Sequence, residues 1–127
     1  MEILEIGETQ NTPYVLLNPN GKIEFIGRSI PENSMSFYKP ISAWMKEYSE
    51  QDIKHTTVAT FQIEYFNTSS SKCLLDIFKR LDSMYMRGCD IQLHWVCDRN
   101  DNDLYEAGLD FETMLKCPLS IERIDMD

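Results

Sequence analysis

The sequence predicts a single α/β domain, in which about five strands form a mixed sheet with three main helices in the order β-β-α-β-α-β-α-β. Segments rich in β-branched and aromatic residues alternate with segments whose apolar residues recur every three or four positions, as expected for strands and helices respectively. An Asn-Gly pair separates the first two strand-like segments, which is typical of a hairpin turn. A length of 127 residues corresponds to one domain, so we expect residues 1–127 to fold as one unit.

The hairpin comprises residues 13–17 and 22–26, which flank the turn sequence NPNG. The loop GRSIPENS follows, and an apolar stripe then predicts the first helix; its members are Phe37, Tyr38, Ile41, Trp44, Met45 and Tyr48. Proline is tolerated in a helix mainly within the first turn. Because Pro40 falls inside the stripe, we expect this helix either to start near Ser36 or to be kinked.

The rest of the chain alternates strand and helix. Three more strands are predicted at residues 57–66, 91–97 and 119–124. Two further helical stripes run from Cys73 to Tyr85, with Gly88 as a C-terminal stop, and from Leu104 to Leu115, ended by Pro118. Short strand–helix–strand connections imply right-handed crossovers and mainly parallel neighbours.

The composition excludes some functions. The chain has 21 acidic and 12 basic residues, a formal net charge of −9, and no run of Lys and Arg that would bind a nucleic acid backbone. Such an acidic surface favours solubility and would steer the chain towards a basic partner. The N-terminus has no secretory signal pattern and no apolar run approaches the length of a membrane span, so we expect a cytoplasmic protein.

No cofactor or metal site is indicated. The four cysteines, Cys73, Cys89, Cys97 and Cys117, lack CxxC spacing and fit a reduced core. The stretch 98–103 (DRNDND) begins like a calcium loop, but Asp103 stands where glycine is required and Leu109 where glutamate is required. We therefore expect a solvated loop in which Asp101 or Asp103 caps the third helix.

The stretch YFNTSSSK (residues 65–72) places four hydroxyls between a predicted strand and a predicted helix. In open α/β sheets, ligands and modifying enzymes reach the loops at the carboxyl ends of parallel strands, and the loops 67–71 and 98–103 both lie there. One capping side chain explains one such residue, and possibly two. Two interpretations stay open from these residues alone: capping only, or a hydroxyl that is modified or catalytic.

A nucleophilic enzyme needs a base beside its hydroxyl, and the chain has only two histidines. His55 lies in a predicted loop at the opposite edge of the sheet, and His94 lies mid-strand with its side chain opposite to the apolar face. No GxSxG, GxxxxGK[ST] or GxGxxG motif is present. We therefore expect no enzymatic activity.

Three stretches, GRSIPENS, EYFNTSSSKCLLDI and HWVCDRND, resemble the SiaC-type bacterial regulatory phosphoproteins, small proteins with a fold similar to STAS domains (the domains of anti-sigma-factor antagonists). The resemblance covers nearly the whole chain. Its most specific parts are PENS (Pro31, Glu32, Asn33, Ser34) and NTSS (Asn67, Thr68, Ser69, Ser70).

The resemblance implies that Thr68 is phosphorylated by a partner kinase and dephosphorylated by a PP2C-type phosphatase. The unphosphorylated form would bind and activate a diguanylate cyclase, which links the switch to cyclic-di-GMP and biofilm formation. PENS is implied to lie beside the phosphosite, and we expect Asp98 nearby. Ser69, Ser70 and Ser71 are alternative acceptors. The alternative function is a STAS-like domain that binds a small ligand or nucleotide at the same edge.

Overall fold

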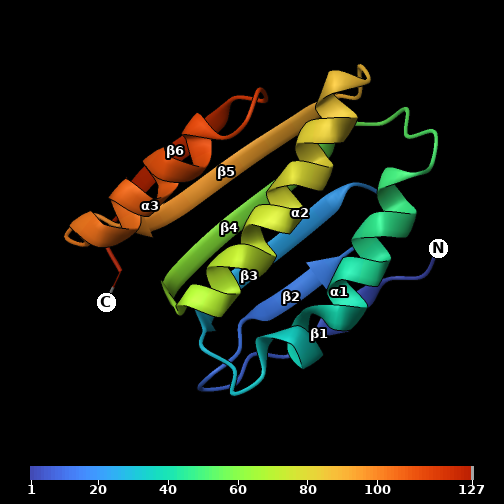
Figure 1. The fold of residues 1–127 in the computed structure, drawn as a ribbon. Coiled ribbons are helices and arrows are strands. Elements are labelled where there is room, and N and C mark those ends of the chain that lie inside the picture. Colours follow the sequence, from blue (N-terminus) through green and yellow to red (C-terminus); the bar gives the residue numbers. More distant parts are fainter. Residues whose placement is uncertain (127) are drawn as a thin grey trace.

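The strands of the sheet lie side by side in the order in which they occur along the chain, in a computed structural model that describes residues 1–126 (Figure 1). They are β1 (Leu4–Ile6), β2 (Tyr14–Leu17), β3 (Lys22–Ser29), β4 (Thr57–Phe66), β5 (Ile91–Asp98) and β6 (Leu119–Ile124). β1, β2 and β3 pair antiparallel, whereas β3, β4, β5 and β6 pair parallel. The mixed α/β fold and all five predicted strands are confirmed.

The sheet has one strand more than the sequence predicted. β1 is only three residues long and pairs with β2 at the edge of the sheet. A three-residue segment is too short to show an alternation of apolar and polar residues, so its strand conformation depends on pairing with β2 and not on its own sequence.

Three helices connect the parallel strands: α1 (Ser34–Ser49), α2 (Thr68–Met86) and α3 (Asn102–Thr113). Each parallel strand is added on the same side of the preceding one, and right-handed crossovers then place all three helices on one face of the sheet. Figure 1 shows this arrangement, with α1 and α2 packed against each other and α3 over β5 and β6. The opposite face of the sheet carries no helix of residues 1–126.

The core lies between the sheet and the helices. Along β3, β4 and β5 alternate residues point to the helices, and aromatic rings occupy the centre of that face. Phe25 and Phe61 stack with ring centroids 5.1 Å apart, and Phe78 of α2 lies 4.4 Å from Phe61. Phe111 of α3 packs 5.3 Å from Trp95 in the same way. These contacts hold α2 and α3 against the sheet, and so they position the N-termini of both helices relative to its edge.

Pro40 lies inside α1, beyond its first turn, because the helix already begins at Ser34. The proline nitrogen has no hydrogen to donate to the Ser36 carbonyl four residues earlier. Both Pro40 and Ser36 are exposed, so water can bond to this carbonyl. The helix therefore starts two residues earlier than Ser36 and continues through the proline.

Gly88 ends α2 as predicted. Its φ of +99° lies in the region that favours glycine, directly after the C-cap Arg87. The Cys89 N–H donates to the Met84 carbonyl at 3.0 Å, and the Gly88 N–H donates to the Tyr85 carbonyl at 3.0 Å. This pair of bonds is a Schellman motif.

Candidate functional site

The candidate site lies where β3 and β4 end and α1 and α2 begin. Asn67 is the N-cap of α2, and its side chain accepts from the Ser70 N–H at 2.9 Å. Asn33 caps α1 in the same way, accepting from the Ser36 N–H at 3.1 Å. Because both caps follow neighbouring parallel strands, the PENS and NTSS segments meet at one edge of the sheet.

A chain of hydrogen-bonded hydroxyls joins the two segments, and we call it the hydroxyl network; its members are Tyr38, Ser29, Ser70, Ser34 and Ser69. The Tyr38 and Ser29 oxygens lie 2.6 Å apart, and Ser29 donates to Ser70 at 2.9 Å. The Ser70 and Ser34 oxygens are 3.5 Å apart, and those of Ser34 and Ser69 are 2.7 Å apart. Ser69 donates to the Asn67 side-chain oxygen at 3.2 Å.

The direction of the hydroxyl network follows from its ends. A hydroxyl has one hydrogen to donate, and Ser29 gives its hydrogen to Ser70, so Tyr38 must donate to Ser29. Likewise Ser69 gives its hydrogen to Asn67, so Ser34 must donate to Ser69. The donors therefore run in one direction from Tyr38 to the cap of α2.

Tyr38 stays protonated in this network. Its side chain is buried, and burial raises the pKa of the phenol to about 12, although the hydrogen bond with Ser29 acts in the opposite direction. Every member of the hydroxyl network is therefore neutral at physiological pH. A neutral, internally bonded network fixes the start of α2 without placing a charge in the core.

The four consecutive hydroxyls differ in their surroundings. Ser70 is completely buried and Ser69, although exposed, bonds to Ser34 and Asn67. Ser71 is half-buried in the first turn of α2. Thr68 is exposed as the first residue of α2, and among residues 1–126 its hydroxyl makes no hydrogen bond.

The other predicted site residues are placed as follows. Pro31 is buried and Glu32 is exposed in the loop before α1. Asp98 ends β5 at the same edge of the sheet, where it accepts from the Asn100 N–H at 3.0 Å. It lines a hollow of about 430 Å³ together with Glu64 and Asp101, and it shares no hydrogen bond with the hydroxyl network.

Tyr65 is 59% exposed beside this edge because β4 contains an extra residue there. The pairing of β3 with β4 shifts between Gly27 and Arg28, so that Gly27 lies opposite Ile63 but Arg28 opposite Tyr65. This shift turns Phe66, and not Tyr65, towards Trp95 and Phe111.

Ser29 and Tyr38 are members of the hydroxyl network that the sequence did not single out. Ser29 continues the buried alternation of Phe25 in β3, and a hydroxyl at such a position needs a buried partner. Tyr38 belongs to the apolar stripe of α1, and this pattern reflects its aromatic ring but not its hydroxyl. The signal was therefore present, but the partners lie 9 and 41 residues apart.

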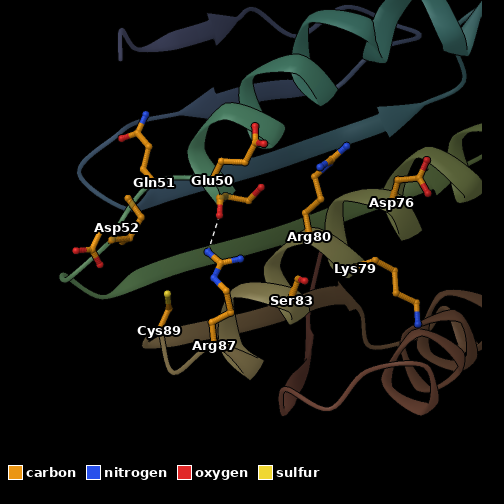
Figure 2. Close-up of a pocket in the computed structure, with 11 residues that line it drawn as sticks. Glu50, Gln51, Asp52, Asp76, Lys79, Arg80, Ser83, Arg87 and Cys89 are labelled. Atoms are coloured by element: carbon orange, nitrogen blue, oxygen red, sulfur yellow. Dashed lines mark hydrogen bonds between the residues drawn. The ribbon is translucent and has the colours of Figure 1, made fainter.

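Other polar groups and hollows lie away from the hydroxyl network. His94 bonds through Nδ1 to Glu122 at 3.1 Å on the uncovered face of the sheet. Within the described residues, no group of three or more His, Cys, Asp or Glu side chains could hold a metal ion. No helix of residues 1–126 has the length and apolar character to cross a membrane. A hollow of about 940 Å³ lies at the opposite ends of α1 and α2 (Figure 2).

Comparison with known proteins extends this description. Residues 6–124 match the model of a protein family that is described as the SiaC family regulatory phosphoproteins. The chain belongs to this family. One relative, an uncharacterized protein of Pseudomonas aeruginosa (strain UCBPP-PA14), is 28% identical over 126 residues, which is 98% of this chain and 99% of that protein.

Solved structures agree with the SiaC family assignment. Apo-SiaC from Pseudomonas aeruginosa has a TM-score of 0.87 and 28% identity, covering 96% of this chain and 99% of the other. A chain in the crystal structure of the diguanylate cyclase SiaD in complex with its activator SiaC, also from Pseudomonas aeruginosa, has a TM-score of 0.88 and 27% identity, covering 95% and 99%. The family resemblance and the STAS-like fold are thereby confirmed.

Proposed function

We propose that this SiaC family member is a non-enzymatic cytoplasmic switch protein that is controlled by reversible phosphorylation of Thr68. A partner kinase adds the phosphate and a PP2C-type phosphatase removes it. The unphosphorylated form binds and activates a diguanylate cyclase, and so controls cyclic-di-GMP and biofilm formation.

The observation that carries this proposal is the state of the Thr68 hydroxyl. It is exposed and has no hydrogen-bond partner in residues 1–126, whereas its neighbours Ser69 and Ser70 are held in the hydroxyl network. A kinase can reach Thr68 without breaking a hydrogen bond of the folded protein. Phosphorylation of the completely buried Ser70 would require the start of α2 to open.

The position of Thr68 also supports a switch that leaves the fold intact. A phosphate adds about −1.5 to −2 charges at pH 7. At the first residue of α2 this charge lies near the positive end of the helix dipole, which favours it by about 0.3–1 kcal/mol. The same anion, buried in an interface shaped for a neutral hydroxyl, would cost several kcal/mol and would prevent binding.

A cyclase as the output partner is supported by the similarity to the structure in which SiaC is the activator of SiaD. A small-ligand or nucleotide pocket at the same edge has less support. The hollow beside Asp98 is lined by Glu64, Asp98 and Asp101 with Arg28 as its cation, a charge balance that repels anionic nucleotides.

Phosphorylation can be tested with the kinase from the same genome and ATP, by measuring intact mass. We expect one added phosphate on the wild type and none on Thr68→Val, which keeps the Asn67 cap of α2. Ser71→Ala is the matched control, because it removes a neighbouring hydroxyl and should still be phosphorylated. Equal phosphorylation of Thr68→Val and the wild type would refute Thr68 as the acceptor.

A further inference from the structure

Thr68 and Ser69 are adjacent hydroxyl residues that exposure alone does not distinguish. Both are exposed at the start of α2. Ser70, in contrast, is completely buried, and Ser71 is half-buried in the first turn of the helix. A kinase that reaches Thr68 therefore also reaches Ser69, and another property must decide which of the two is phosphorylated.

The Ser69 hydroxyl is held by two hydrogen bonds, whereas the Thr68 hydroxyl makes none within residues 1–126. Ser69 donates to Asn67 Oδ1 at 3.2 Å, so its only hydrogen is in use. The Ser34 and Ser69 oxygens lie 2.7 Å apart, and Ser34 must be the donor of this shorter bond. The bond from Ser34 is therefore the stronger restraint on the position of the Ser69 oxygen.

The hydroxyl of Ser34 serves the neighbouring segment and not its own helix. Asn33 already caps α1 by accepting from the Ser36 N–H. The Ser34 side chain is buried, and within residues 1–126 its hydrogen-bond partners are Ser69 and Ser70 of the NTSS segment. A buried hydroxyl needs a partner, and here α2 supplies both of them.

Phosphoryl transfer needs an acceptor oxygen that is free to move into line with the phosphate. The bond from the hydroxyl oxygen to the γ-phosphorus of ATP forms as the bond to the bridging oxygen breaks, ADP leaves, and the hydroxyl proton passes to a base of the kinase. The oxygen must approach the phosphorus to about 3–3.5 Å. Ser69 is not free to do so, because Ser34 fixes its oxygen and Asn67 holds its proton. The exposed Thr68 hydroxyl carries neither restraint.

We propose that Ser34 of the PENS segment is a specificity-determining residue of the phosphorylation reaction. Its hydroxyl keeps Ser69 from acting as an acceptor, so the kinase modifies Thr68 alone. The inference rests on the proposed function, because it concerns the same site and the same kinase. It limits the switch to two states, one without a phosphate and one with a single phosphate.

The test removes the bond from Ser34 and maps the phosphorylated residue. The protein is incubated with the kinase of the same genome and ATP, and intact mass and peptide fragmentation give the number and position of phosphates. Thr68→Val alone should stay unmodified over the time in which the wild type is fully modified. Ser34→Ala combined with Thr68→Val should gain one phosphate on Ser69. An ordinary hydrogen bond contributes about a factor of ten to a rate, so Ser69 should react at least about tenfold faster once this bond is removed.

Ser29→Ala combined with Thr68→Val is the matched control. It also removes a buried hydroxyl of the hydroxyl network, but this hydroxyl bonds to Tyr38 and Ser70 and not to Ser69. The control therefore weakens the start of α2 to a similar degree and leaves the bond from α1 to Ser69 in place. It should gain no phosphate.

Ser34→Cys is a second variant for the case in which the alanine variant does not fold. The thiol fills the space of the hydroxyl but is only a weak donor. Combined with Thr68→Val, this variant should also gain a phosphate on Ser69. Melting curves establish which variants are folded.

The possible outcomes separate this inference from the proposed function. A phosphate on Ser69 in the Ser29 variant as well as the Ser34 variants would mean that any loosening of α2 releases Ser69, and the role of Ser34 would be wrong. It would also be wrong if no folded Ser34 variant gains a phosphate on Ser69 while the wild type is modified on Thr68; the proposed function would then stand. A wild type that takes no phosphate on Thr68 would overturn both.

Discussion

The hydroxyl run of the NTSS segment divides its tasks residue by residue. Asn67 caps α2, and Ser69 and Ser70 bond to the first residue of α1 and the last residue of β3. The Thr68 hydroxyl makes no hydrogen bond within residues 1–126. The last residue of β3 is Ser29, whose hydroxyl also links α2 to Tyr38. The segment therefore combines a rigid base with one exposed hydroxyl, which suits a site that is modified without unfolding.

Tyr38 should make stability depend on pH at alkaline values. The pKa of its phenol is about 12 in the folded protein, against an ordinary value of 10.0. The unfolded chain therefore loses this proton first, so the stabilisation is fully present below pH 10 and is lost as pH rises from 10 to 12. A difference of two pH units corresponds to at most about 2.7 kcal/mol of unfolding free energy.

Tyr38→Phe tests this prediction, because phenylalanine keeps the ring and removes the ionising group. Denaturant titrations of both proteins between pH 9 and pH 12 should show a steeper loss of unfolding free energy for the wild type. Other raised groups, among them Cys117 with a pKa of about 11, remain in both proteins and cancel in the difference. Parallel curves would show that the phenol does not titrate with a raised pKa.

At the residue scale the sequence predicts which segment holds the candidate site, but it does not predict the hydrogen-bond partner of each hydroxyl. Four adjacent hydroxyls after a strand pointed to the site, and Asn67 was recognisable as a cap. Ser34 of α1, the partner of Ser69 and Ser70, lies 35 and 36 residues from them in the chain, and Ser29 lies 41 residues from Ser70. No local pattern reports such pairings.

The helix and strand boundaries were predictable where local chemistry sets them. Gly88 ends α2 through its positive φ, and Asp101 caps α3 by accepting from the Leu104 N–H at 3.1 Å. β1 and the start of α1 were not predicted correctly, because β1 depends on pairing with β2 and Pro40 is tolerated by its exposure. Tertiary context decided both.

Asp82 shows how an apparently polar position of α2 holds two elements together. Its side chain is buried, and one carboxylate oxygen accepts from the backbone N–H groups of Lys116 and Cys117 at 2.9 and 2.8 Å. These groups lie in the turn between α3 and β6. Asp82 does not belong to the apolar stripe of α2, and the sequence does not show this role because the partners of Asp82 are 34 and 35 residues distant.

Asp82→Ala should therefore lower the unfolding free energy by about 3 kcal/mol, since it removes a charged acceptor and leaves two N–H groups without it. Chemical denaturation measures this loss. Asp76→Ala is the control on the same helix, because Asp76 is exposed and should change stability by less than about 0.5 kcal/mol. Similar values for the two variants would mean that Asp82 is not a structural link.

The charge distribution is a property of the whole molecule that the linear sequence does not display. Six of the 12 basic residues lie on α1, on α2 and at the C-cap of α2. They are spread between positions 39 and 87 with acidic residues between them, so no basic run is visible in the sequence. Folding brings them to one layer, because all the crossovers place their helices on the same face of the sheet. The net charge of −9 is therefore spread unevenly: with both C-caps counted, α1 and α2 carry six basic and four acidic residues, and all other segments carry six basic and 17 acidic ones.

The charge of residue 68 should control partner binding at the level of the whole complex. Thr68→Asp should weaken binding to the cognate diguanylate cyclase on the order of tenfold, or about 1.4 kcal/mol, whereas Thr68→Ala should retain wild-type affinity. The carboxylate loses its water at the interface without gaining a cation there. It carries one charge and lacks the three oxygens of a phosphate, so the loss is partial.

Calorimetry of the wild type, Thr68→Ala and Thr68→Asp against the cyclase measures these affinities, and melting curves establish that all three are folded. Ser120→Asp is the matched control, because it adds the same charge at an exposed residue of β6, far from α1 and α2 in the sheet order. Its affinity should equal that of the wild type. If the folded Asp and Ala variants of Thr68 bind equally well, residue 68 lies outside the interface, and its phosphorylation must act on the partner by another route.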